Sequence, residues 1–106
     1  MKLCITAKGN NLDAAIDPSF GRCQYFIFVD SETLQFEAVE NPNTRASGGA
    51  GTNSGQLIAN KGTDVLLTGD VGPNAARVLA AAGVNVVTGA TGTVREAVTA
   101  WKKGAS

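Results

Sequence analysis

The glycine-rich loops are the part of this sequence whose composition and spacing point most directly to chemistry. Thirteen glycines occur, and most gather at residues 48–55, at 69 and 72, and at 89 and 92. Each group stands just before a segment predicted to be helical, where free N–H groups and the positive end of the helix dipole favour an anion. Glycine also lets the backbone approach a ligand closely. We therefore predict one cup for a negatively charged ligand, with these candidate residues: Gly48, Gly49, Gly51, Thr52, Gly69, Gly72, Asn74, Gly92 and Thr93.

Arg22 is the candidate for the cationic side chain of such a site. It follows Phe20-Gly21 in a long predicted connection, and its guanidinium is always charged. An ordinary surface arginine is the alternative interpretation. Arg45, close to the glycine-rich loop, is a second candidate, whereas Arg77 and Arg95 are predicted to be solvated charges on helix faces.

Cys23 directly follows Arg22 and is the candidate metal ligand. As a thiolate it could bind copper or iron, and the neighbouring arginine and helix ends are expected to lower its pKa. A thiol that packs under Tyr25 is the equal alternative. Cys4 lies in the first predicted strand, where side chains alternate between the two faces, and it is expected to be a core residue.

The residue types that are absent exclude several classes of chemistry. No histidine occurs and there are only two cysteines, so the chain has no Ser-His or Cys-His nucleophile pair and cannot build a four-ligand Cys/His zinc site alone. The formal net charge is zero, which disfavours nucleic acid and anionic membranes as partners. No apolar run reaches the length of a membrane span, Met1-Lys2-Leu3 is expected to lead into a strand rather than to form a signal peptide, and cysteine is sparse. We therefore expect a cytoplasmic location.

A nucleotide- or phosphate-binding regulatory module is the alternative function. The P-loop motif is absent, and residues 49–55 approximate the dinucleotide fingerprint with one residue too many. Asp70 resembles the ribose-binding acid, but the preceding strand ends near Val39, too early for a tight strand-to-helix turn. Asp13, Asp17 and Asp70 do not have the spacing of a known magnesium loop, and no surface stripe indicates a protein partner.

The elements that position these residues are predicted to form a single α/β domain over residues 1–106. Strands are predicted at 3–7, 25–29, 34–39, 64–68 and 85–88. Helices are predicted from the end of the 46–55 loop to Asn60, from Pro73 to Gly83, and from a capping box at residues 93–96 to Gly104. Gly62, Gly83 and Gly104 are interpreted as helix ends. The order β-β-β-α-β-α-β-α predicts a mixed five-stranded sheet in which an antiparallel meander precedes two parallel strands.

Short motifs spread over nearly the whole chain resemble the dinitrogenase iron–molybdenum cofactor biosynthesis family, which includes NifX-like carriers, the C-terminal part of NifB and small orange proteins. The motifs are Gly9-Asn10-Asn11-Leu12-Asp13, Phe20-Gly21-Arg22, Tyr25-Phe26, Glu40-Asn41-Pro42-Asn43, Gly48-Gly49-Ala50-Gly51, Thr68-Gly69, Gly72-Pro73-Asn74-Ala75 and Gly92-Thr93-Val94.

The resemblance implies a ribonuclease-H-like three-layer fold without ribonuclease activity, and a non-enzymatic carrier of an anionic metal–sulfur cluster. The implied cargo is a molybdenum–copper sulfide cluster or an iron–molybdenum cofactor precursor, bound mainly without covalent bonds. It also implies cytoplasmic ATPases of the cell-division type as partners. Because histidine is absent, ligation through imidazole is excluded in this chain.

Overall fold

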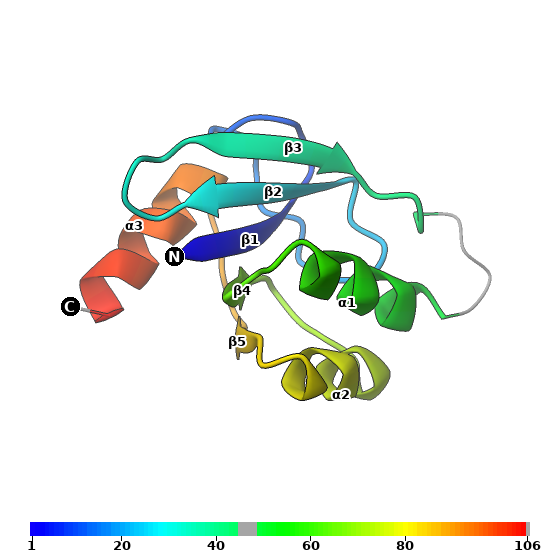
Figure 1. The fold of residues 1–106 in the computed structure, drawn as a ribbon. Coiled ribbons are helices and arrows are strands. Elements are labelled where there is room, and N and C mark those ends of the chain that lie inside the picture. Colours follow the sequence, from blue (N-terminus) through cyan, green and yellow to red (C-terminus); the bar gives the residue numbers. More distant parts are fainter. Residues whose placement is uncertain (45–48, 106) are drawn as a thin grey trace.

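The computed structural model describes residues 1–44 and 49–105, and this part of the chain forms one mixed sheet with helices on both faces (Figure 1). The sheet order is β3-β2-β1-β4-β5. Strand β1 pairs antiparallel with β2, and β2 with β3, while β4 is parallel to β1 and β5 is parallel to β4. The predicted meander and parallel pair are therefore confirmed. The elements are β1 (Lys2–Ala7), β2 (Tyr25–Asp30), β3 (Phe36–Glu40), α1 (Ala50–Asn60), β4 (Val65–Leu67), α2 (Pro73–Ala81), β5 (Asn85–Val87) and α3 (Val94–Ala105).

Two hydrophobic cores lie on opposite faces of the sheet, because successive side chains of a strand point to opposite faces. Leu3 and Ile5 of β1 pack with Val94 and Val98 of α3. Cys4, between them, packs with residues of α1 and α2 and confirms the expected core position. Figure 1 shows the resulting layers, with α3 on one side of the sheet and α1 and α2 on the other.

Helix α1 begins at Ala50, so the prediction that residues 50–55 belong to a loop is wrong. The low helix propensity of this glycine-containing stretch is offset by packing against α2. A Cβ at Gly51 would lie 3.2 Å from the Cβ of Ala75, and one at Gly55 would lie 3.0 Å from Cγ1 of Val78. The two glycines therefore allow the helices to approach more closely than larger residues would.

The long connection between β1 and β2 runs across the carboxyl ends of the parallel strands. Ile16 bridges to Ala7 of β1, and Ser19 bridges to Asp70, just beyond β4. The amide of Asp17 donates to the Thr6 carbonyl oxygen at 3.0 Å. This path carries residues 19–23 to the edge of the sheet where α1 and α2 begin.

The hairpin between β2 and β3 differs from the predicted one. The third strand begins at Phe36 rather than Leu34, because Leu34 has a left-handed backbone with φ of 62°. Strand β3 lies at the edge of the sheet. Among the described residues, no helix has both the length and the apolar character needed to cross a bilayer.

Candidate functional site

A cavity of about 290 Å³ lies where the N-termini of α1 and α2 meet the β1–β2 connection. This volume is at the lower end of the range for small-ligand sites, roughly 300–1,000 Å³. Its position beyond the carboxyl ends of parallel strands is where α/β sheets bind ligands. The lining residues are Ser19, Phe20, Arg22, Gly49, Ala50, Gly51, Thr52, Gly72, Pro73, Asn74 and Ala75.

Both helix ends at the cavity present backbone donors without side-chain caps. The N-cap of α1, Gly49, has a left-handed backbone with φ of 72°, and that of α2, Gly72, is extended. A left-handed residue followed by helical ones turns successive N–H groups towards one point, a known anion-binding arrangement. Neither helix carries an acidic residue in its first turn, so the positive ends of both dipoles remain uncompensated there.

Arg22 is exposed and gives the described part of the cavity a positive charge, since none of the lining residues within 1–44 and 49–105 is acidic. Its position depends on Gly21, whose φ is 99° and whose added Cβ would lie 3.2 Å from both the N and Cα atoms of Gly51. The backbone before Arg22 therefore rests directly on the first turn of α1. A guanidinium beside two helix N-termini can bind an anion through several charge-assisted hydrogen bonds.

A buried polar network fixes this segment. The Nδ2 of Asn41 donates to the carbonyl oxygens of Gly21 and Cys23, each at 2.9 Å. The Oγ of Ser54, on α1, donates to the same Gly21 oxygen at 3.1 Å. Asn41 is 2% exposed and Ser54 is fully buried, so these contacts are shielded from water. The end of β3 and helix α1 together hold the two residues that flank Arg22.

The structure brings six of the predicted site residues together and places others elsewhere. Those lining the cavity are Arg22, Gly49, Gly51, Thr52, Gly72 and Asn74. Gly48 and Arg45 lie outside the described residues. Sequence reasoning missed Asn41 and Ser54 as supports of the site. Asn41 belongs to the Glu40-Asn41-Pro42-Asn43 motif of the family resemblance, which pointed to no role for its side chain, and Ser54 stands in a stretch interpreted as a loop.

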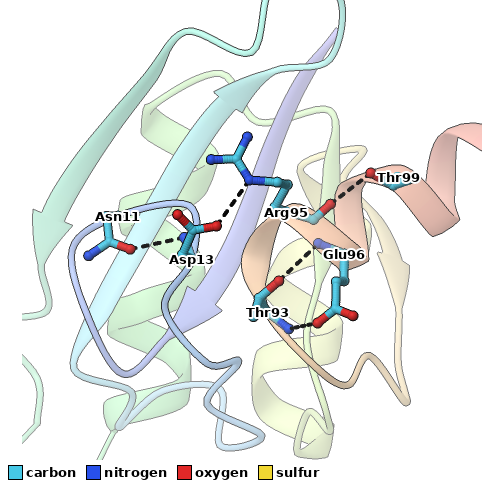
Figure 2. A network of polar contacts seen from close by, with 6 residues as sticks. All are labelled: Asn11, Asp13, Thr93, Arg95, Glu96 and Thr99. Atoms are coloured by element: carbon cyan, nitrogen blue, oxygen red, sulfur yellow. Dashed lines mark hydrogen bonds and ion pairs between the residues drawn. The ribbon is translucent and has the colours of Figure 1, made fainter.

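Gly92 and Thr93 do not line this cavity, so the prediction that three loops form one cup is wrong for the third loop. They precede α3, which covers the opposite face of the sheet from α1 and α2. Figure 2 shows what Thr93 does there: its Oγ1 accepts from the Glu96 amide at 3.1 Å, and its own amide donates to Glu96 Oε1 at 2.9 Å. The predicted capping box is thus confirmed, and the hydroxyl and amide of Thr93 form their hydrogen bonds within the first turn of α3.

Gly69 also lies outside the cavity lining, and its role is close packing. A Cβ added there would lie 2.5 Å from the Cα of Pro18 and 2.8 Å from its carbonyl oxygen. The Asp70 amide donates to that same Pro18 oxygen at 3.0 Å. The absence of a side chain at Gly69 lets the β1–β2 connection cross the end of β4.

We expect Gly69→Ala to lower the free energy of unfolding by roughly 2 kcal/mol or more, since backbone atoms must shift to relieve the overlap. Gly72→Ala is the matched control, because nothing lies within 4 Å of its added Cβ and its φ of −75° suits any residue. Urea unfolding of both variants measures the difference. Equal stability of the two variants would contradict the packing role.

Cys23 lies in the hydrophobic core next to α1 and α2 and does not line the cavity. Its side chain is fully buried, and the pKa of its thiol is raised to about 12, chiefly by desolvation and secondarily by the charge of Asp17. The expectation of a lowered pKa is therefore wrong, because desolvation of the buried thiolate outweighs the hydrogen bonds, such as that from Asn41, that lower the pKa. Cys23 is therefore a packing thiol, but it packs in the core with Phe26 and Phe28 and not under Tyr25, which packs against the core on the other face of the sheet. Both cysteines are free.

The acidic residues considered for a magnesium or nucleotide site do not converge. Asp13 pairs with Arg95 at 3.1 Å, the Oδ1 of Asp17 accepts from the Ser19 amide, and the Oδ1 of Asp70 accepts from the Val71 amide. Asp70 does not line the cavity. Within residues 1–44 and 49–105, no three His, Cys, Asp or Glu side chains gather into a metal-binding group.

Comparison with known proteins places these features in context. The profile of the family described as dinitrogenase iron-molybdenum cofactor matches residues 1–104. The chain is similar to the apo form of the orange protein from Desulfovibrio gigas, with 43% identity, a TM-score of 0.94, and coverage of 97% of this chain and 88% of that one. A putative NifB protein from Thermotoga gives 37% identity, a TM-score of 0.84 and the same coverage of both chains. The uncharacterized protein MJ0580 of Methanocaldococcus jannaschii is 31% identical over 107 residues, covering 98% of this chain and 87% of that protein.

Proposed function

Because this chain belongs to the dinitrogenase iron-molybdenum cofactor family, we propose that it is a non-enzymatic carrier of an anionic metal–sulfur cluster. The cargo we propose is a molybdenum–copper sulfide cluster or a related iron–molybdenum cofactor precursor. The similarity to the orange protein and to a putative NifB protein supports this class of cargo.

The observation that carries the proposal is the cavity of Arg22 between two uncapped helix N-termini. Its lining contains no cysteine, histidine or carboxylate, so the chemistry of the donor set favours hydrogen bonds over ligation to a metal. Sulfide atoms of a cluster with several negative charges can accept from the guanidinium and from first-turn amides. Ser19 and Thr52 bear the hydroxyl groups of the described lining, and no histidine or carboxylate lies there to act as a general base for either.

The test is a titration of the purified protein with tetrathiomolybdate and copper(I), followed by visible absorption and elemental analysis. We expect saturable binding with sulfide-to-metal bands, and we expect amide shifts in isotope-labelled protein at the N-termini of α1 and α2. Parallel titrations with ADP and inorganic phosphate test the nucleotide alternative. Tight ADP binding at this cavity, with no uptake of thiomolybdate and copper, would overturn the carrier function.

We also propose that the layers of sheet and helices form a fold of the ribonuclease-H-like type. The two free, buried thiols fit a reducing compartment, and we propose the cytoplasm.

A further inference from the structure

A second cavity, of about 200 Å³, lies between α3 and the hairpin that joins β2 to β3. It shares no lining residue with the cavity of Arg22. It exists because a single helix packs on this face of a five-stranded sheet, so the side of α3 towards β2 and β3 is left open. Its apolar lining comes from Leu12, Val29 and Val98, which are buried, and from Leu34, which is 37% exposed.

The rim of this groove is basic. Arg95, Lys102 and Lys103 line it along α3, all three are exposed, and no acidic residue lines it in the part of the chain that the structure describes. Arg95 uses its Nε to contact Asp13 at 3.1 Å, and Figure 2 shows the two terminal nitrogens of its guanidinium turned away from that carboxylate. An apolar floor beside cations is complementary to a hydrophobic side chain with acidic neighbours.

Leu34 is the unusual residue of the groove. Its φ of 62° is a conformation that favours glycine and is disfavoured for a side chain with a Cβ. The surrounding turn holds it there: Asp30 Oδ1 accepts from the amides of Glu32 and Thr33, and the Leu34 amide donates to the Asp30 carbonyl oxygen at 2.9 Å. A large apolar residue is thus kept partly exposed at a position where its backbone is strained, a combination found at binding sites.

We propose that this groove docks an acidic segment of a partner protein that inserts one apolar side chain against Leu34 and Val98. Charge complementarity selects this occupant over a two-fold symmetric dimer through this face, because each copy would then present the same cations to the other. Docking here leaves the cavity of Arg22 open. The evidence for this docking site comes from the groove alone, so the site does not depend on which cargo the protein carries.

The test uses Leu34→Gly, which removes the apolar contact and suits the left-handed backbone, so the fold is expected to persist. Phe36→Ser is the matched control, since Phe36 is 45% exposed on the same hairpin and does not line the groove. The probes are a short synthetic peptide with a central leucine flanked by glutamates, and the same peptide with glutamines. Binding is followed by amide shifts of isotope-labelled protein.

We expect the glutamate peptide to shift the amides of Val98 and Thr99, and to bind roughly tenfold or more weakly to Leu34→Gly, because burial of a leucine side chain is lost. The glutamine peptide should bind more weakly to the wild type, and added salt should weaken the glutamate peptide. If Leu34→Gly does not fold, Leu34→Asn, which also tolerates this conformation, takes its place.

Equal binding of the two peptides, shifts confined to another surface, no binding to the wild type, or unchanged binding by Leu34→Gly would each overturn the proposal. So would a concentration-dependent dimer that Leu34→Gly abolishes, because the groove would then take a second copy. None of these outcomes bears on thiomolybdate binding, so failure here is distinguishable from failure of the carrier function.

Discussion

Arg22→Ala is expected to bind the thiomolybdate–copper cluster roughly 10- to 100-fold more weakly than the wild type, with unchanged stability. Hydrogen bonds to charged groups contribute about 1.5–3 kcal/mol each, and every 1.4 kcal/mol is a tenfold change in affinity. Arg22 is exposed and is the charged residue among the described residues that line the cavity, so its loss removes binding free energy without disturbing the core. The measurement is a titration followed by visible absorption, with thermal unfolding of the same samples.

Arg77→Ala is the matched control for the net charge. Arg77 lies on α2, is exposed, and does not line the cavity, so its loss is expected to leave the affinity near that of the wild type. Arg22→Lys keeps the charge but loses the planar fork of donors, and we expect it to recover only part of the affinity. Equal weakening by Arg22→Ala and Arg77→Ala would mean that only overall charge matters, and the Arg22 site would have to be abandoned.

Asn41→Ala is expected to cost roughly 2–4 kcal/mol of unfolding free energy and to weaken cluster binding as well. The substitution leaves the buried Cys23 carbonyl oxygen without its donor and removes one of two donors to that of Gly21. Each buried polar group left unsatisfied costs about 1–3 kcal/mol. It also frees the segment on both sides of Arg22, so the guanidinium is no longer positioned. Urea unfolding and the cluster titration measure the two effects.

Ser54→Ala is expected to destabilise the protein less than Asn41→Ala does. It removes the second donor to Gly21 but leaves that oxygen its bond from Asn41, so a loss of roughly 1 kcal/mol is expected. Asn41→Asp keeps the oxygen that accepts from the Asn43 amide at 2.9 Å and replaces the donor with a carboxylate that faces two carbonyls. We expect it to be at least as damaging as the alanine variant. Wild-type stability of Asn41→Ala would contradict the positioning role.

Features decided by neighbouring residues were predictable from the sequence. Pro73 begins α2, Gly62 follows α1 with φ of 75°, and Thr93 and Glu96 form the capping box of α3. Each of these depends on backbone groups within about one helical turn, so the residue types suffice to identify it. The role of Arg22 and of the helix N-termini as cavity residues followed from the same local reasoning joined to the topology of parallel strands.

The remaining features were decided by contacts between segments far apart in the chain. Helix α1 extends back to Ala50 because α2 packs on Gly51 and Gly55, and a window of sequence does not contain that neighbour. Cys23 became a buried thiol through core packing, and desolvation in that core raises its pKa although Arg22 is its neighbour in the chain.

Residue types and their spacing were enough to locate most strands and helices and to indicate which residues could bind an anion. The packing of distant elements placed α3 on the other face of the sheet, which separates Thr93 from the cavity, and brought Asn41 under the Arg22 segment. The physical reason is the separation along the chain of the groups that interact. Caps and turns are stabilised by groups a few residues apart, whereas burial and the shape of a cavity depend on which distant surfaces meet when the sheet is covered.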